Sequence, residues 1–275
     1  MSKRDYTKEA VEAARSVLLE VMHVLGAFQK DIAVVGGLVP DFIIPGKPFV
    51  GSLDIDLALN HKNLTDVGYK TICELLLDRG YIQQKDKPFT FLRNVPVNDG
   101  AITVAVDLLS GEYEGTGKSH RHQKIQDTVA RKARGCDLVF EVPAIEIELR
   151  GELPGGGIDS AIIKVASVVP FVVMKSMALG DRLKEKDAWD IYFVLRNYPS
   201  GPDAIVKEFE PYSDHGLVKE GLKILCGKFE SEKHAGPKMV ADFAEIEDQE
   251  ERERIQRDSF EHVNFLLEKL GVLKP

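Results

Sequence analysis

Residues 31–59, DIAVVGGLVPDFIIPGKPFVGSLDIDLAL, constrain the fold of this chain more than any other stretch. The pattern predicts a short buried strand over residues 32–35, followed by a tight turn and a loop. A second strand is expected next, which ends by presenting Asp54 and Asp56. Side chains at i and i+2 on a strand lie on the same face, so we expect these two carboxylates side by side.

Both aspartates lie in an otherwise apolar run, which argues against a solvated surface strand. Two adjacent carboxylates repel each other unless a cation lies between them. We expect this cation to be Mg²⁺, which binds one or two carboxylates and keeps its other positions for substrate phosphates. The double glycine agrees with this expectation, because Gly36 and Gly37 permit a tight turn and a close backbone approach to a phosphate.

This stretch resembles the signature of the nucleotidyltransferase superfamily. In that signature a double glycine follows a first strand, a Ser or Thr comes next, and Asp-x-Asp lies on the following strand. The second strand, Ser-Leu-Asp-Ile-Asp-Leu, is most similar to the AbiEii/AbiGii-type branch, which contains nucleotidyltransferase toxins. The resemblance implies an α+β fold, with a mixed or antiparallel sheet, flanking helices and a helical C-terminal domain. The matching residues are Gly36, Gly37, Ser52, Asp54 and Asp56.

Composition places the chain among folded globular proteins, since 44% of its 275 residues are hydrophobic and 29% are charged. We predict a nucleotidyltransferase-like α/β domain over residues 1–166 and a helical domain over residues 167–275. No apolar run approaches the roughly 18–20 residues of a membrane span, and the N-terminus lacks a signal core, so we expect a cytoplasmic protein without a membrane partner. The net charge of −8 argues against broad non-specific nucleic-acid binding, although it allows a local basic patch.

Apolar spacing predicts a helix over residues 7–30 that is capped by Thr7, and a second helix over residues 64–79. Turn residues between residues 89–95 and 101–109 predict that these two strands form an antiparallel hairpin. Further strands are expected over residues 81–84, 138–142, 144–149 and 161–165. Further helices are expected over residues 216–228, 237–243 and 251–270.

Asp107 lies in the apolar strand TVAVDLL. A carboxylate there either caps a turn at the end of the strand or faces Asp54 and Asp56 across the sheet as a third acidic group. The nucleotidyltransferase superfamily has a third acidic residue on such a strand, and Asp107 matches its place. The resemblance therefore implies that Asp54, Asp56 and Asp107 hold two Mg²⁺ ions.

Two glycine-rich stretches suggest nucleotide binding but lack the required spacing. The segment EGTGKS lacks the glycine that a P-loop has five residues before its Gly-Lys pair, and no apolar helix follows. We interpret residues 111–124 as a surface loop and residues 151–159 as a flexible hairpin connection. The first loop carries basic residues that are open to phosphate contact, namely Lys118, Arg121 and Lys124.

A helix is expected to begin at Pro170 and to continue past Gly180 to about residue 198. Lys175, Arg182, Lys186 and Asp190 fall at helical spacing on one stripe of it. An exposed salt-bridged face explains the charges after residue 180. It does not explain Lys175, whose neighbours in the sequence are apolar. A long cation beside an acidic metal site can neutralise a triphosphate.

The same segment carries a second resemblance. The AbiEii-like family has a Lys, then an Arg, then a helix with Lys/Arg-Asp-x-x-Asp, and this chain has the same residue types in the same order. The resemblance implies that Lys175 contacts nucleotide phosphate and that Asp187 or Asp190 supports the site. The expected catalytic residues are Asp54, Asp56, Asp107 and Lys175. The expected nucleotide-binding residues are Gly36, Gly37, Ser52, Lys175, Arg182, Lys186 and Asp190.

These features together predict a Mg²⁺-dependent enzyme that transfers a nucleoside monophosphate from an NTP to an acceptor. The resemblance implies the toxin of a toxin–antitoxin pair, with RNA such as a tRNA 3′ end as acceptor and a cognate antitoxin as partner. A protein side chain is the alternative acceptor for the same chemistry. The alternative of another class is an inactive nucleotidyltransferase fold that binds a nucleotide or a partner.

Overall fold

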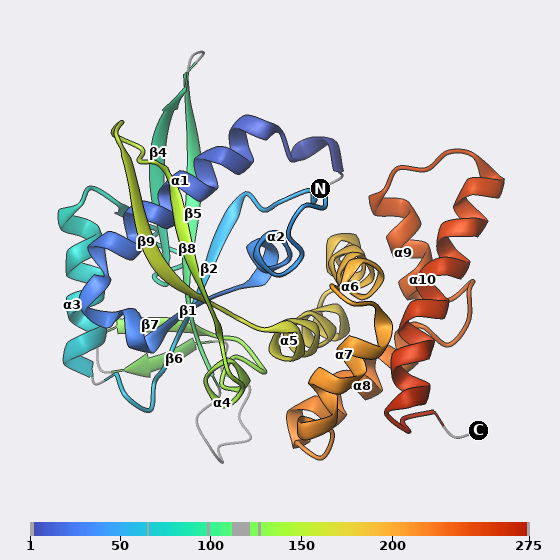
Figure 1. Ribbon diagram of the computed structural model, residues 1–275. Coiled ribbons are helices and arrows are strands. Elements are labelled where there is room, and N and C mark those ends of the chain that lie inside the picture. The colour runs from blue at the N-terminus through green and yellow to red at the C-terminus, as the bar shows by residue number, and fades with distance from the viewer. Residues whose placement is uncertain (1–2, 65, 98–99, 112–121, 126–127, 274–275) are drawn as a thin grey trace. The chain divides into compact units, whose positions relative to one another are not determined.

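Figure 1 shows the computed structural model of the chain, which describes residues 3–64, 66–97, 100–111, 122–125 and 128–273. The chain divides into two compact units. The sheet unit comprises Tyr6–Val39 and Gly51–Ser167, and the helical unit comprises Met1–Asp5, Pro40–Val50 and Val168–Pro275. The division at Val168 lies next to the predicted domain boundary, and the helical unit also takes in two segments from the first half of the chain.

The sheet unit is built on one mixed sheet with the strand order β3-β4-β5-β2-β1-β9-β8, and β7 extends it beside β5. β2 pairs with β1 in antiparallel and with β5 in parallel orientation. The predicted hairpin is confirmed, because β4 and β5 pair in antiparallel orientation. The strands are β1 (Ile32–Val35), β2 (Asp54–Leu59), β3 (Ile82–Gln83), β4 (Thr90–Val97), β5 (Gly100–Ser110), β6 (His122–Ile125), β7 (Thr128–Lys132), β8 (Ile145–Glu152) and β9 (Ile158–Val165).

Helix α1 (Lys8–Val24) covers part of this sheet and packs against β8 and β9 as well as β4 and β5. Its predicted cap is confirmed, since the amide of Ala10 donates to Thr7 Oγ1 over 3.3 Å. The helix ends earlier than expected, and the 3₁₀ segment Gly26–Asp31 leads into β1. A second helix, α3 (Asp66–Asp78), corresponds to the one predicted over residues 64–79.

The strand predicted over residues 138–142 is wrong, because this stretch forms the short helix α4 (Leu138–Glu141). A short apolar run does not distinguish a buried strand from a buried helix by periodicity alone. The strands predicted on either side of residues 151–159 are confirmed as β8 and β9, and Gly156 and Gly157 turn the hairpin with φ of 86° and 88°. Of the basic residues proposed for phosphate contact, Lys118 and Arg121 lie outside the described residues, as does the side chain of Lys124.

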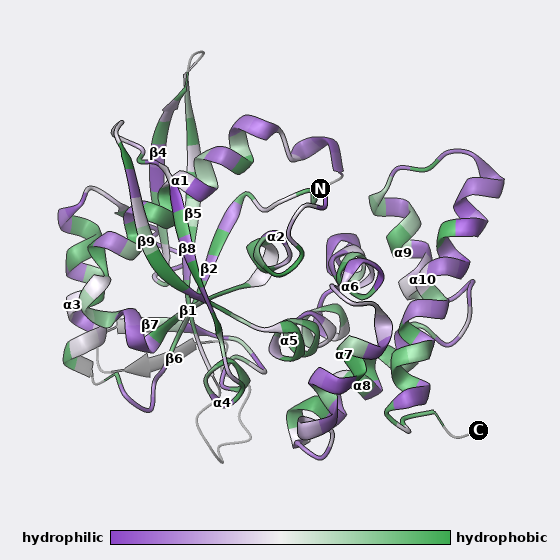
Figure 2. Cartoon of the chain, viewed as in Figure 1, coloured by the Kyte–Doolittle hydropathy of each residue, from purple (hydrophilic) through white to green (hydrophobic). Residues whose placement is uncertain are grey.

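The helical unit contains α5 (Val168–Asp181), which packs against α6 (Glu185–Asn197) and α8 (Gly216–Lys228). Figure 2 shows α5 as predominantly hydrophobic, and its largely buried residues form part of the core of this unit. Helix α6 also contacts α9, and α10 contacts both of these helices. The remaining helices are α2 (Val39–Ile43), α7 (Pro202–Phe209), α9 (Ala235–Phe243) and α10 (Gln249–Lys269). The first residue of α2, Val39, is the last residue of a segment of the sheet unit.

The single helix predicted from Pro170 to about residue 198 is wrong. It is interrupted at residues 182–184, between α5 and α6, so the chain folds into a pair of packed helices. The start lies at Val168, which places Pro170 in the first turn, where its missing N–H costs no helical hydrogen bond. The helices predicted from residue 216 onward are confirmed as α8, which has the predicted bounds, and as α9 and α10, which have shifted ends.

These elements confirm the predicted α+β class, which consists of a mixed sheet with flanking helices and a helical C-terminal region. Among the residues described, no helix combines the length and the apolar character needed to span a membrane.

Candidate functional site

Two of the three predicted acidic residues lie opposite each other on neighbouring strands of the sheet unit. Asp56 of β2 is in register with Asp107 of β5, and Asp107 is in register with Thr90 of β4. Residues in register on adjacent strands project to the same face. Asp56 and Asp107 therefore share a face, and Asp54 shares it because it precedes Asp56 by two residues. We call the side of the sheet that carries Asp54, Asp56 and Asp107 the acidic face.

The position of the two aspartates within their strand differs from the prediction. β2 begins at Asp54, so the pair stands at the start of the strand and not at its end. The predicted alternation is correct, because Ile55 and Leu57 are fully buried on the opposite face while Asp54 is exposed and Asp56 is half-buried. The second strand thus presents its carboxylates on one face and its large apolar side chains, Ile55, Leu57 and Leu59, on the other.

Gly36 follows β1 immediately and lies against the acidic face. Its φ is 71°, and a Cβ atom at this position would lie 2.0 Å from Asp56 Oδ2. Both the backbone conformation and the space therefore require glycine here. In this structure the close approach is that of a carboxylate, and the predicted approach of a phosphate to Gly36 and Gly37 stays a prediction. Ser52, which is buried, lies two residues before β2.

Each carboxylate oxygen of Asp107 contacts a different residue. The hydroxyl of Thr90 donates to Oδ1 over 2.5 Å, and Arg131 Nη1 lies 3.7 Å from Oδ2. The sequence analysis missed Arg131. Only the pairing of β5 with β7, which places Leu109 opposite Arg131, brings this side chain to the acidic face, and no local motif signals that pairing.

The metal prediction was tested against these residues. Among the residues described, no group of three or more His, Cys, Asp or Glu side chains is already gathered as a metal site. The donor chemistry fits Mg²⁺, because three carboxylates share one face and this ion takes oxygen ligands. As a ligand, Asp107 would bind the ion beside or in place of its present partners, Thr90 and Arg131.

The predicted cationic residues form a separate group within the helical unit, where α5 and α6 pack together. Lys175 Nζ lies 2.9 Å from Asp187 Oδ1 and 2.7 Å from Asp190 Oδ2. Lys186 Nζ contacts both oxygens of Asp190, at 2.8 and 2.9 Å. Arg182 Nε lies 3.1 Å from Asp187 Oδ2. We call these five residues the paired charge cluster.

Most of the paired charge cluster is buried. The side chains of Asp187 and Asp190 are 1% and 0% exposed, whereas that of Arg182 is 45% exposed. Burial alone would lower the pKa of Lys175, but Asp190 and Asp187 raise it above its usual value. Burial alone would likewise raise the pKa of Asp187, yet Lys175 and Arg182 hold it below its usual value. Both groups are therefore charged at neutral pH.

Lys186 differs from Lys175, since burial and the neighbouring charge of Lys175 lower its pKa below the usual value although Asp190 opposes them. Its ammonium group lies 5.1 Å from the centre of the Phe49 ring, which packs against Phe193 at 4.8 Å. The cluster is assembled by the packing of two helices and not by a stripe on one helix, so the predicted stripe is wrong. The predicted contact of Lys175 with phosphate stays a prediction, and the structure gives this ammonium group two carboxylate partners.

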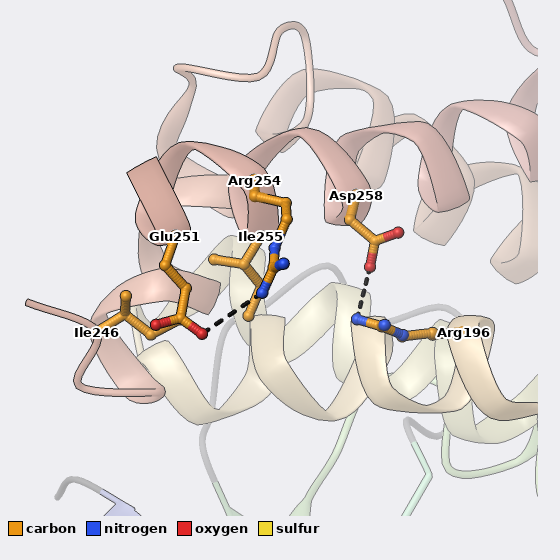
Figure 3. A pocket seen from close by; sticks show the side chains of 6 residues that line it. All are labelled: Arg196, Ile246, Glu251, Arg254, Ile255 and Asp258. Atoms are coloured by element: carbon orange, nitrogen blue, oxygen red, sulfur yellow. Dashed lines mark hydrogen bonds and ion pairs between the residues drawn. The ribbon is translucent and has the colours of Figure 1, made fainter. Parts of the chain in front are cut away.

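A cavity of about 400 Å³ lies in the helical unit between α6, α10 and the segment before α10 (Figure 3). Arg196 Nη1 and Asp258 Oδ2 are 2.7 Å apart, and Arg254 pairs with Glu251 at 3.5 Å. No residue predicted to act in the site lines this cavity. The lining residues are Arg196, Ile246, Glu251, Arg254, Ile255 and Asp258.

No protein-family model matches the chain, and no curated protein matches it significantly. Among solved structures it is similar to JHP933 from Helicobacter pylori, with a TM-score of 0.48 and 13% identity over 97% of this chain and 95% of that one. It is also similar to MenT4, a nucleotidyltransferase toxin from Mycobacterium tuberculosis, with a TM-score of 0.45 and 14% identity over 100% of both chains. MenT4 belongs to the class of protein that the sequence motifs resemble. Likenesses of this size assign no activity, so a function has to be inferred from the residues of this chain.

Proposed function

We propose that this protein is a nucleotidyltransferase that transfers a nucleoside monophosphate from an NTP to an acceptor and releases pyrophosphate. One observation carries this proposal: Asp54, Asp56 and Asp107, from two parallel strands, share one face of the sheet. Carboxylates on one face repel one another, and a divalent cation that draws them together would relieve this repulsion. The motif around Gly36 and Gly37 supports the same reading.

Mg²⁺ is the cofactor that we propose, and Asp54, Asp56 and Asp107 are the residues that would hold it as two ions. When bound, Mg²⁺ would offset the negative charge of the triphosphate and lower the pKa of an attacking hydroxyl. Asp107 shares a face of the sheet with Asp54 and Asp56, and it is our candidate general base for the proton of the acceptor hydroxyl.

The other residues of the chain bind and orient the nucleotide in this proposal. Backbone N–H groups of the turn at Gly36 and Gly37 and the hydroxyl of Ser52 hold the β- and γ-phosphates. Lys175 offsets the charge of the departing pyrophosphate, with Arg182 and Lys186 as further cations and Asp190 positioning the lysines. The paired charge cluster contains three cations and two carboxylates.

We further propose that the protein is the toxin of a toxin–antitoxin pair, acting in the cytoplasm on RNA, with a tRNA 3′ end as acceptor and a cognate antitoxin as partner. This part rests on the similarity of the motifs to AbiEii-type proteins. A protein side chain is the alternative acceptor, and the reaction at phosphorus is the same for either hydroxyl.

The test is incubation of the full chain with Mg²⁺ and each labelled NTP, in the presence of total RNA or of lysate protein. Labelled RNA supports the proposal, and labelled protein establishes the alternative acceptor. Asp56→Asn should abolish transfer while the circular dichroism spectrum stays that of the parent. Asp214→Asn is the matched control, because this aspartate is 99% exposed and its substitution should leave transfer unchanged. Undiminished turnover by the Asp56→Asn variant would refute the assignment.

The second candidate is a catalytically inactive module that binds a nucleotide or a partner. The observation that favours it is the contact between Arg131 and Asp107, in which a guanidinium group compensates the third carboxylate. The same incubation separates the two functions, because nucleotide binding without transfer to either acceptor indicates the inactive module.

A further inference from the structure

Arg131 belongs to the acidic face although it comes from a different part of the sheet. It is in register with Leu109 on the parallel pair β5–β7, and Leu109 follows Asp107 by two residues. Alternation along a strand and register between strands therefore put the side chains of Asp107 and Arg131 on the same face. Among the side chains of β7 that the structure describes, only that of Arg131 lies on this face and contacts Asp107.

The contacts of Asp107 are unequal. The 2.5 Å hydrogen bond from Thr90 fixes Oδ1, whereas Arg131 approaches Oδ2 only to 3.7 Å. The side chain of Arg131 is 41% exposed and that of Asp107 is 18% exposed. An ion pair of this length and exposure is weak, because solvent competes for both groups. Arg131 is therefore the partner that Asp107 can exchange most easily.

The chemistry of a guanidinium group suits such an exchange. Its planar set of N–H donors binds a carboxylate and a phosphate with similar geometry, and its charge does not change with pH in the range where proteins fold. We propose that Arg131 competes with a divalent ion for Asp107, and that once the ion has taken this carboxylate Arg131 binds the phosphate oxygens of the NTP. This inference rests on the proposed function and adds a specificity-determining residue to it.

Replacing Arg131 should then have opposite effects on two affinities. Arg131→Gln removes the competitor, so the affinity for Mn²⁺, used as the probe ion without nucleotide, should rise about two- to fivefold at low salt. The gain should shrink at high salt, because the ion pair is screened. The affinity of the ion-loaded variant for a non-hydrolysable NTP analogue should fall by roughly three- to tenfold.

Two further variants separate this role from simpler ones. Arg131→Lys keeps the charge but loses the planar donor set, so it should leave ion affinity near the parent value and restore only part of the analogue affinity. Lys132→Gln removes one positive charge from the next residue of β7, which projects to the other face, and should change neither affinity more than twofold. General loss of stability would move both affinities in the same direction.

The experiment is calorimetric titration of Mn²⁺ and then of the analogue into the full-length parent, the three variants and Asp56→Asn, with melting temperatures recorded for each protein. The inference is supported if Arg131→Gln binds Mn²⁺ more tightly and the analogue more weakly than the parent, while Lys132→Gln changes neither affinity. If the parent binds Mn²⁺ through Asp56 but Arg131→Gln binds ion and analogue as the parent does, only the inference is overturned. If the parent binds no Mn²⁺, the proposed function fails and the inference falls with it.

Discussion

The acidic face and the paired charge cluster are both rich in charge, yet they hold it in different ways. On the acidic face, carboxylates stand side by side on strands and are half-buried or exposed. In the cluster, each carboxylate lies between cations, and Asp190 is completely buried between Lys175 and Lys186. The first arrangement places like charges next to one another, while the second pairs each carboxylate with cations within the fold.

This difference indicates what each region does for the protein. A buried charge is tolerated only when it has partners, so each charge buried between α5 and α6 depends on the opposite charge beside it. Adjacent carboxylates on a sheet face contribute nothing comparable to packing and add repulsion. Substitutions in the cluster should therefore change stability first, and substitutions on the acidic face should change activity first.

The largest change in the free energy of unfolding is expected at Asp190, and it tests the distinction between the cluster and the acidic face. Asp190→Asn should destabilise the helical unit by about 3–5 kcal/mol, because it removes the shared partner of Lys175 and Lys186. Asp54→Asn, which changes an exposed carboxylate, should alter stability by no more than about 0.5 kcal/mol. Urea unfolding followed by fluorescence of Trp189, the single tryptophan of the chain, reports on the helical unit, and circular dichroism reports on both units. Equal destabilisation by the two variants would remove the distinction.

A smaller effect is expected where the acidic face meets the glycine turn. Gly36→Ala should cost about 2–3 kcal/mol, since it combines an unfavourable positive φ with a clash against Asp56. Gly157→Ala is the matched control, because its φ of 88° is similar but no atom lies within 4 Å of the added Cβ. We expect about 1 kcal/mol for the control. The difference between the two free energies of unfolding measures the close approach of Asp56, and identical values would show that this approach is unimportant.

Acid should destabilise the cluster through Asp187. Although burial opposes it, Lys175 and Arg182 lower the pKa of Asp187 in the folded protein, so the unfolded chain binds this proton more readily. The stabilisation is fully present above the usual Asp value of about 4 and is lost as the pH falls from there through the lowered pKa. The free energy of unfolding should therefore decrease over this interval, and Asp187→Asn should flatten the decrease while lowering stability at pH 7. Urea titrations at several pH values measure the slope, which should not be the same in the parent and the variant.

The smallest effect is expected at Thr90. Thr90→Val preserves shape but removes the hydrogen bond to Asp107, and should cost about 1 kcal/mol. Thr103→Val is the control on the same pair of strands, because Thr103 makes an exposed hydrogen bond to Asn94 and its loss should cost less than about 0.5 kcal/mol. Chemical unfolding resolves such a difference, and a larger loss for Thr103→Val would contradict the idea that Thr90 anchors Asp107.

Features that depend on neighbouring residues could be predicted from the sequence. The Thr7 cap, the strand β1, the alternation around Asp56 and the hairpin of β4 with β5 all follow from patterns a few residues long. Features that depend on distant partners could not. The interruption between α5 and α6 lets α6 pack on α5, where Asp187 contacts Lys175. A contact between two separate helices cannot be predicted from the residue spacing within one helix. Arg131 reaches Asp107 only through the addition of β7 beside β5.

The parallel pairing of β2 with β5 has a consequence for how the acidic face comes into being. Asp56 and Asp107 are roughly fifty residues apart in the chain, and the intervening segment contains α3, β3 and β4. Parallel neighbours need such a crossover, and contacts at this separation form slowly because closing the loop costs entropy. A nascent chain that has emerged only as far as β2 carries the Asp-x-Asp pair without its third carboxylate. The three acidic groups therefore come together only after most of the sheet unit has been synthesised and β5 has paired with β2.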